Sequence, residues 1–387
     1  MSIRLPSYDE LTQDEQRPAY NLPLNRNYLV KGAPGTGKSI IALYRAARFK
    51  DKGSSADVKF LVFNKTLRKY LEQAVVQLDL ANSSVDNWHR WFNNSFMPWY
   101  NRTFSAHLTI QDTFDGKDPG WDTICANVQR VPVDQRPENW DHLVLDEAQD
   151  LPSGLIRLLS LLTRSATIFA DQHQRILESS RESIIQDIMN YFSIDQGAVY
   201  YLTRNFRNSE EISKVAQSFY VGLTGDLPAH AFHHGPKPRL TLSSGIDATA
   251  ELIANIADNN PGSHVGVILP PTKSLQAYYK AVSSKTDTAT VQLYQTTDRD
   301  DRFDFDETGV KIMSYNVMKG LEFDFVIIPE LSAYADNEHG HNILYVASTR
   351  AQRELIYVYT APERTSFVVR TLQSLNETEH FLDEDAL

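Results

Sequence analysis

The sequence predicts an α/β protein built from parallel sheets flanked by helices, on the basis of three observations. Short apolar segments alternate with amphipathic ones along most of the 387 residues, an arrangement typical of strands and helices in layered folds. The alternation occurs as two separate sets, one in each half of the chain. A glycine-rich loop follows the first apolar segment, as expected where a strand passes into a helix. We therefore expect two tandem α/β domains.

Short apolar runs predict eight buried strands. Four are expected at residues 28–30, 60–63, 143–145 and 167–169, and four at residues 265–269, 311–314, 325–328 and 355–359. Helical periodicity predicts helices at residues 39–49, 65–78, 209–221 and 273–282. The two sets meet near residue 195, which predicts a first domain over residues 1–195 and a second over residues 196–375. Residues 83–140 are rich in Trp, Asn and Pro and are expected to form a small insertion in the first domain.

The composition excludes two classes of protein. A single cysteine, Cys125, rules out a disulfide scaffold and favours a reducing compartment. No apolar run approaches the roughly 20 residues that cross a bilayer, and residues 1–10 lack the apolar stretch of a signal peptide. We therefore expect a cytoplasmic protein without a membrane partner.

The formal net charge of −11 argues against a nucleic-acid partner, because such proteins usually carry a basic surface. The location of the charges changes this interpretation. Residues 298–307 hold six acidic residues and two arginines, and residues 376–387, expected to be a frayed acidic tail, hold five acidic residues. Residues 40–80 instead hold eight lysines and arginines against four acidic residues. This local excess of positive charge suits contact with a phosphate backbone.

The run Gly32-Ala33-Pro34-Gly35-Thr36-Gly37-Lys38-Ser39 matches the phosphate-binding pattern G-x-x-x-x-G-K-[ST] in full. Gly32, Gly35, Thr36 and Gly37 would let backbone N–H groups surround phosphate oxygens at the positive end of a helix. Lys38 is expected to reach the β- and γ-phosphates, and Ser39 to ligate Mg²⁺. The strand before the loop and the helix after it disfavour the alternative, a glycine-rich turn without function. The expected cofactors are ATP and Mg²⁺.

Two carboxylates follow the expected strand at residues 143–145. Asp146 would order the Mg²⁺, and Glu147 would polarise the attacking water, so that the site hydrolyses its nucleotide. Taken alone, the pair would equally suit an acidic helix start, where carboxylates are favoured. Beside a phosphate loop, the catalytic interpretation is the stronger one.

From Asp146-Glu147-Ala148-Gln149-Asp150 onward, the sequence resembles superfamily I helicases of the UvrD/Rep-like kind. Further motifs of that family follow in the family's order, so the resemblance spans most of the chain. It implies two RecA-like P-loop NTPase domains in tandem with ATP·Mg²⁺ between them. It also implies translocation on single-stranded nucleic acid in the 3′→5′ direction. DNA is the preferred expectation for this nucleic acid, and RNA is the alternative.

The resemblance implies roles for three residues that bind the nucleotide. Gln16 would read the adenine, because a side-chain amide offers both a donor and an acceptor; a polar helix start is the alternative. Gly320 would approach the phosphates and Glu322 the ribose, within Lys319-Gly320-Leu321-Glu322-Phe323. A solvated helix start is the alternative for Glu322.

Three further residues are implied as catalytic. Gln174 would sense the γ-phosphate, although a polar loop would contain the same residue type. Arg207 and Arg350 would stabilise charge on the γ-phosphate in the transition state, since a guanidinium fork suits phosphate oxygens. Surface ion pairs are the alternative for both arginines.

Five residues are expected to contact nucleic acid. Asn64 and Lys65 end the expected strand at residues 60–63, in a segment that resembles a strand-contacting motif of the family. Trp88, His89 and Trp91 lie in a second such motif and could stack on bases, each contact contributing roughly 1–3 kcal/mol. The equally weighted alternative is that these aromatic side chains belong to the core.

The family's motors commonly carry large accessory domains, for which this chain has little room. ATP hydrolysis is therefore better supported than duplex unwinding, because a motor core does not specify its output. Two alternatives stay open beside a translocating helicase. One is an ATPase switch that controls a partner, such as a nuclease in repair or phage defence. The other is a binding module without turnover, which the presence of Lys38 and Glu147 disfavours.

Overall fold

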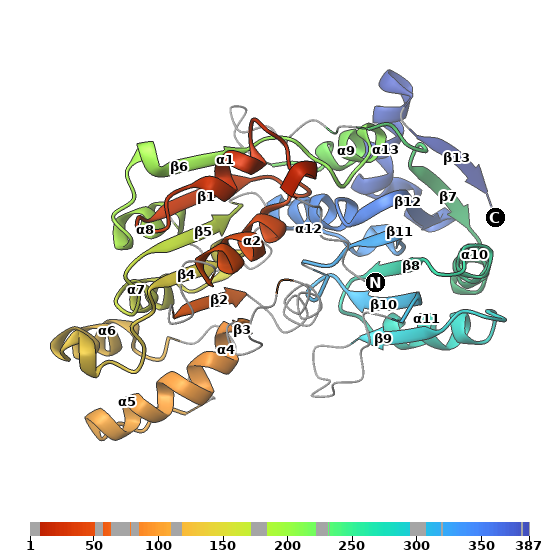
Figure 1. Ribbon diagram of the computed structural model, residues 1–387. Helices are drawn as coiled ribbons and strands as arrows, with labels where there is room; N and C mark the ends of the chain where they lie inside the picture. The colour runs from red at the N-terminus through yellow and green to blue at the C-terminus, as the bar shows by residue number, and fades with distance from the viewer. Residues whose placement is uncertain are drawn as a thin grey trace. The chain divides into compact units, whose positions relative to one another are not determined.

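The structure is a computed structural model that describes residues 8–50, 57–62, 78, 85–109, 118–171, 184–221, 231, 233–294, 307–318, 320–380 and 382–386. The chain divides into two compact units. The first contains Ile3–Ala33 and Gly37–Thr203, and the second contains Pro34–Thr36 and Arg204–Leu387. Each unit has a parallel sheet with helices on both faces (Figure 1). The predicted α/β class is therefore confirmed.

The first unit contains a six-stranded sheet in the order β3-β2-β4-β5-β1-β6. All its strand pairs are parallel. The strands are β1 (Tyr28–Gly32), β2 (Val58–Val62), β3 (Val85–Asn87), β4 (His142–Leu145), β5 (Ala166–Ala170) and β6 (Val199–Leu202). Its α-helices are α1 (Gln16–Asn21), α2 (Lys38–Lys50), α4 (Trp88–Trp91), α5 (Met97–Phe104), α6 (Trp121–Arg130), α7 (Ser153–Ser160) and α8 (Ile184–Tyr191).

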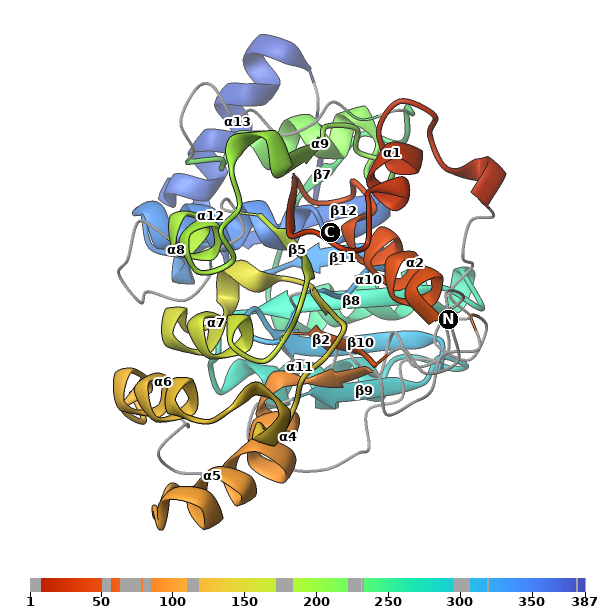
Figure 2. The ribbon, with the colours of Figure 1, turned by 60° about the vertical axis from the view of Figure 1, so that its left-hand side comes forward.

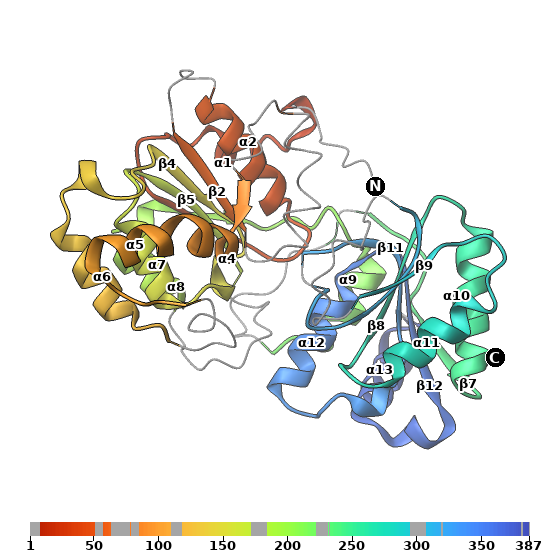
Figure 3. The same cartoon turned by 90° about the horizontal axis from the view of Figure 1, so that it is seen from below.

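The two faces of this sheet bury alternate residues of each strand. Val30, Phe60 and Val144 pack with α1 and α2 in one core. Their neighbours Leu29 and Leu61 pack with α7 and α8 in the other core. Figure 3 shows α2 on one side of the sheet and α7 and α8 on the opposite side. This alternation follows from the two-residue period of a strand, and it explains why strands covered on both faces are apolar throughout.

The second unit contains a seven-stranded sheet in the order β13-β7-β12-β11-β8-β10-β9, again with parallel pairs. The strands are β7 (Arg239–Ser243), β8 (His264–Leu269), β9 (Val291–Tyr294), β10 (Gly309–Ser314), β11 (Phe323–Ile328), β12 (Ala351–Thr360) and β13 (Asp383–Ala386). Helices α10 (Ile246–Asn259) and α11 (Ser274–Ser283) cover one face. The other face carries α9 (Glu210–Gln217), α12 (Glu338–Ser348) and α13 (Phe367–Glu379), as Figure 3 shows.

Short helical turns connect these elements. In the first unit they are η1 (Tyr8–Glu10), the π-helical turn η3 (Phe92–Phe96), η5 (Val133–Gln135), η6 (Ala148–Asp150) and η7 (Gln196–Ala198). In the second unit they are η8 (Leu331–Ala333) and η9 (Ala361–Thr365). Across the ranges that the structure describes, no helix combines the length and apolar character needed to cross a bilayer.

Two predictions about domain organisation need correction. The first domain does not end near residue 195, because β6 pairs with β1 and the units divide between Thr203 and Arg204. The tail over residues 376–387 is not frayed throughout, because Asp383–Ala386 forms β13 beside β7. Within the small insertion expected at residues 83–140, β3 joins the first sheet, and α4 to α6 share a hydrophobic cluster with α7 and α8. Figure 2 shows α4, α5 and α6 gathered together. The helix expected at residues 65–78 lies almost entirely outside the described residues.

Candidate nucleotide-hydrolysis site

The phosphate loop connects β1 to α2, as its sequence predicts. Gly35 and Gly37 have φ values of 77° and 86°, a left-handed conformation that favours glycine. A Cβ atom on Gly35 would lie 2.0 Å from Oδ1 of Asn205. A Cβ atom on Gly37 would lie 2.7 Å from Nε2 of Gln16. Both glycines are thus required by backbone conformation and by close approach of a neighbouring side chain.

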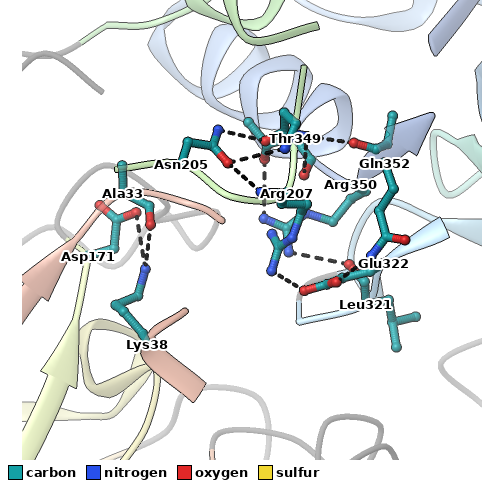
Figure 4. A network of polar contacts seen from close by, with 12 residues as sticks. Ala33, Lys38, Asp171, Asn205, Arg207, Leu321, Glu322, Thr349, Arg350 and Gln352 are labelled. Carbon is teal, nitrogen blue, oxygen red and sulfur yellow. Dashed lines mark hydrogen bonds and ion pairs between the residues drawn. The ribbon is translucent and has the colours of Figure 1, made fainter. Parts of the chain in front are cut away.

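Lys38 is directed back onto its own loop. Its Nζ donates to the carbonyl oxygens of Gly32 at 2.6 Å and Ala33 at 2.9 Å. It also lies 3.9 Å from Oδ2 of Asp171, and only 6% of the residue is exposed. Figure 4 shows the amino end of Lys38 directed toward Ala33 and Asp171. The ammonium group is therefore held at the loop by acceptors that a phosphate oxygen could replace.

Gln16 opens α1 and lies against the phosphate loop. Its Oε1 accepts from the backbone N–H of Thr12 at 3.1 Å, while Oγ1 of Thr12 accepts from the N–H of Gln16 at 3.1 Å. This reciprocal pair satisfies one backbone N–H before α1 and the N–H of the first residue of α1. The structure therefore supports the polar helix start, and it places the Gln16 amide beside Gly37. The adenine contact stays a prediction.

Asp146 follows β4 and is fully buried. Its Oδ1 accepts from the N–H of Glu147 at 3.0 Å, while its Oδ2 has no hydrogen-bond partner among the residues that the structure describes. Burial and, second, the charge of Glu147 raise the pKa of Asp146 to about 7, against a hydrogen bond from Ser39 and the charge of Lys38. A buried carboxylate oxygen without a partner is unfavourable unless a cation or donor compensates it. Oxygen atoms of Asp146 and Ser39 are the ligand type that Mg²⁺ prefers, so these residues fit that ion.

Glu147 occupies a strained position directly after Asp146. Its φ of 53° is left-handed, a conformation that costs a non-glycine residue about 1–3 kcal/mol and clusters at functional sites. Its Oε2 accepts from Nε2 of Gln149 at 2.5 Å, and only 6% of the residue is exposed. The carboxylate that the resemblance assigns to the attacking water is therefore fixed in direction by a neighbouring amide.

Gln149 and Asp171 are functional candidates that sequence reasoning did not select. Oε1 of Gln149 accepts from the backbone N–H of Asp171 at 2.9 Å, and the Asp171 carboxylate faces Lys38. A continuous polar series thus runs from Lys38 through Asp171 and Gln149 to Glu147. Gln149 lies inside residues 146–150, the run that carries the helicase resemblance, and this position is the sequence signal for it.

The raised pKa of Asp146 predicts a gain in stability from Asp146→Asn. Folding raises the pKa of this carboxyl from its usual value of 3.8 to about 7. Such a group increasingly destabilises the folded protein as the pH increases through this range. Without Mg²⁺, we expect the variant to be more stable than wild type at pH 8, and the difference to vanish near pH 4. Thermal melts across this pH range in EDTA measure the effect.

Asp258→Asn is the matched control for this experiment. Asp258 accepts hydrogen bonds from Thr286, Asp287, Thr288 and Ala289, and those from Thr286 and Asp287 lower its pKa although desolvation opposes them. Its stabilising contribution is present above the ordinary pKa and lost as pH falls, so this variant should be less stable than wild type at pH 8. A lower melting temperature for Asp146→Asn at pH 8 would contradict the assignment of Asp146 as a buried, uncompensated charge.

In the second unit, Arg207 forms an ion pair with Glu322 through Nη2 and Oε1. The other carboxylate oxygen of Glu322 accepts from Nε2 of Gln352 at 2.7 Å. Glu322 therefore orients Arg207 in this structure, while its predicted ribose contact stays a prediction. Nε of Arg207 is buried and has no acceptor in the described part of the chain, so the guanidinium retains a donor for an anion. Figure 4 shows Arg207, Glu322 and Arg350 close together.

Arg350 precedes β12 and is almost fully buried. Its Nε donates to the carbonyl of Val346 at 3.0 Å, and Nη2 donates to Oγ1 of Thr349 at 3.2 Å. Its own carbonyl accepts from the N–H of Phe323 at 3.0 Å, next to Glu322. The structure thus places both predicted arginines and Glu322 in one cluster, and the surface ion pair does not describe Arg350. Gly320, with φ of 79°, lies two residues before Glu322.

The predicted nucleic-acid contacts divide into three groups. Trp91 is fully buried, donates from Nε1 to Oε1 of Glu138 at 3.3 Å and packs against Trp140, so the core alternative holds there. Trp88 is also buried, and the ring of His89 stacks on it with centroids 3.5 Å apart. Across the described ranges, Nε1 of Trp88 has no acceptor. The remaining two, Asn64 and Lys65, lie outside the described ranges, as does Gln174, the predicted γ-phosphate sensor.

Two family models match parts of this chain. Residues 25–226 match the Schlafen group 3 DNA/RNA helicase domain, over more than half of the chain, and residues 309–358 match the UvrD-like helicase C-terminal domain. A solved structure of the C-terminal domain of a possible DNA helicase from Lactobacillus plantarum WCFS1 is similar, with 19% identity and a TM-score of 0.35. It covers 46% of this chain and 98% of its own. The comparison with curated proteins gave no match. The two family matches confirm the helicase resemblance.

Proposed function

We propose, because the chain belongs to the family of Schlafen group 3 DNA/RNA helicase domains, that it is a nucleic-acid-dependent ATPase of the helicase type. The observation that best supports turnover is the polar series Lys38–Asp171–Gln149–Glu147. It connects the phosphate-loop lysine to a carboxylate held in a strained conformation. A module that only bound nucleotide would not require a fixed general base beside its phosphate loop.

The chemistry follows from the positions of these side chains. The Nζ atom of Lys38 leaves the loop carbonyl oxygens and binds β- and γ-phosphate oxygens instead. Glu147 accepts a proton from the attacking water while the oxygen of that water bonds to the γ-phosphorus. The bond from phosphorus to the β–γ bridging oxygen breaks, which releases ADP and phosphate. Arg207 and Arg350 stabilise the negative charge that develops. Mg²⁺, held by Ser39 and Asp146, would neutralise phosphate charge when bound.

A nucleic-acid contact is supported at the carboxyl end of β3. Asn87 and Trp88 are both buried there, and each holds an N–H donor that finds no acceptor within the described part of the structure. A buried donor without an acceptor costs about 1–3 kcal/mol, so a phosphate or base oxygen would stabilise it. Hydrogen bonding fits Trp88 better than stacking does, since His89 already covers one of its faces.

For output, we propose 3′→5′ translocation on single-stranded DNA, with ATP and Mg²⁺ as cofactors. An ATPase switch for a partner such as a nuclease is the second candidate. The observation that favours it is that α4 to α6 share the first core instead of forming a separate accessory domain. A tailed-duplex assay separates the two, because the switch hydrolyses ATP and displaces no strand unaided.

The function is tested by ATP hydrolysis with and without single-stranded DNA or RNA. We expect stimulation by a polymer, and no stimulation by either would overturn nucleic-acid dependence. Trp88→Phe removes the free N–H and keeps an aromatic ring, so we expect weaker polymer binding with an unchanged basal rate. Trp91→Phe is the matched control, because its indole donates to Glu138 inside the core. Equal polymer affinity for wild type and Trp88→Phe would contradict a hydrogen-bonding role for Trp88.

A further inference from the structure

Asn208 lies between the two predicted catalytic arginines of the second unit. It follows Arg207 directly, and its side chain reaches the segment that contains Arg350. Its Nδ2 donates to the carbonyl of Thr349 at 3.1 Å and to the carbonyl of Ala351 at 2.6 Å. These two carbonyls belong to the residues on either side of Arg350. One amide therefore fixes the backbone before and after that arginine.

The carbonyl oxygen of the Asn208 side chain accepts a hydrogen bond from the loop that contains Arg207. Oδ1 of Asn208 accepts from Nδ2 of Asn205 at 2.9 Å. Oδ1 of Asn205 in turn accepts from the backbone N–H groups of Arg207 at 3.0 Å and Asn208 at 3.2 Å. Asn208 is fully buried and Asn205 is 4% exposed. Figure 4 shows Asn205 beside Thr349 and Arg350.

The contacts specify an amide at position 208. Two carbonyl oxygens require two donors, and the Asn205 amide requires an acceptor, which together match the inventory of asparagine. A hydroxyl offers a single donor, and a carboxylate would place a charge against two carbonyl oxygens. Because the site is buried, an unmatched group there could not turn to water instead.

We propose that Asn208 is a positioning residue that sets the placement of Arg350 relative to Arg207. The inference rests on the proposed ATPase function, in which both guanidinium groups stabilise the same developing charge. Asn208 touches no reacting atom in this role. Its effect is to hold two arginines, far apart in the sequence, in one rigid block.

The first test is steady-state ATP hydrolysis by Asn208→Ala. A displacement of roughly 1 Å at a catalytic group can cost about 10²-fold in rate, so we expect kcat to fall by up to about 10²-fold with KM for ATP unchanged. Asn260→Ala is the matched control, since that amide donates to the carbonyl of Ile256 at 2.8 Å at the end of α10. Wild-type kcat in Asn208→Ala would overturn the proposal.

A double variant separates positioning from general weakening of the fold. If Asn208 acts through the arginines, Asn208→Ala should slow Arg207→Ala by a smaller factor than it slows wild type. The same factor in both backgrounds would indicate a structural role only and would overturn the proposal. If Asn208→Ala does not fold, Asn208→Ser is the substitute, because its hydroxyl keeps one donor. We expect the kcat of Asn208→Ser to be lower than that of wild type, and a wild-type kcat would overturn the proposal.

Hydrogen exchange tests the proposal without activity. In nucleotide-free protein, residues 349–351 should exchange faster in Asn208→Ala than in Asn260→Ala, because the carbonyls around Arg350 lose their donor. Unchanged protection would overturn the positioning role even if the wild type hydrolyses ATP. A wild type without turnover, combined with faster exchange, would overturn the proposed function and retain the role of Asn208 in holding the arginines.

Discussion

Glu147→Gln should slow ATP hydrolysis by about 10²–10⁴-fold, the usual contribution of a positioned general base. The neutral amide keeps the size of the side chain and can still accept from Gln149, but it cannot take a proton from water. Nucleotide affinity should persist, because Lys38 and the phosphate loop are unchanged. Single-turnover hydrolysis, measured beside binding of a fluorescent ATP analogue, separates the two quantities.

Glu330→Gln is a closely matched control for this variant. Glu330 also follows a central parallel strand, β11, and has a left-handed φ of 58°. Its Oε2 accepts from the hydroxyl of Ser274 at 2.9 Å, and burial raises its pKa. It therefore shares the environment of Glu147 without a phosphate loop in the same sheet. If both substitutions slowed hydrolysis equally, the assignment of Glu147 as the base would be wrong.

Arg207→Ala should reduce kcat by about 10³–10⁵-fold, the range reported for arginines that stabilise phosphoryl transfer. The loss arises in the transition state, so KM for ATP should change far less than kcat. Arg207→Lys should recover little of the rate, because an ammonium cannot present the fork that pairs with Glu322 and a phosphate together. Steady-state kinetics with a saturating polymer measure both parameters.

An exposed arginine provides the control. Arg164 pairs with Asp141 at 2.9 Å, and its side chain is 65% exposed. Exposed ion pairs contribute about 0–1 kcal/mol, so Arg164→Ala should leave both the rate and the fold unchanged. A normal kcat in Arg207→Ala would show that the Arg207–Glu322 pair is structural.

The eight strands predicted from the sequence all overlap strands of the structure, because segments buried on both faces must be apolar along their length. The phosphate loop and the acid pair were also found, since their chemistry constrains consecutive residues. The sequence predicts residues 196–375 as the second domain, which places strand β6 in the wrong domain. Its residues, Val199–Leu202, form the edge of the first sheet, and only its pairing with β1 reveals this.

Residues whose role depends on distant partners could not be predicted. Asn208 binds carbonyls 141 and 143 positions away, and Gln149 binds a backbone N–H 22 positions away. The spacing of residues along the sequence does not predict such contacts. Trp91 shows a different limit, because an aromatic side chain suits a base-stacking surface and a core equally well. Its burial beside Trp140 decides between them.

The pairing of β6 with β1 has a practical consequence for measuring motion. Leu202 lies opposite Gly32, the first residue of the phosphate loop, and the N–H of Thr203 donates to the Glu15 carboxylate at 2.8 Å. Strand pairing and this hydrogen bond therefore hold the chain against the first unit as far as Thr203, directly before Arg204 of the second unit. Tyr201, which is 52% exposed on β6, is consequently a fixed reference point for a fluorophore or spin label. Distances from it to a label placed beyond Arg204 would record displacement of the second unit itself.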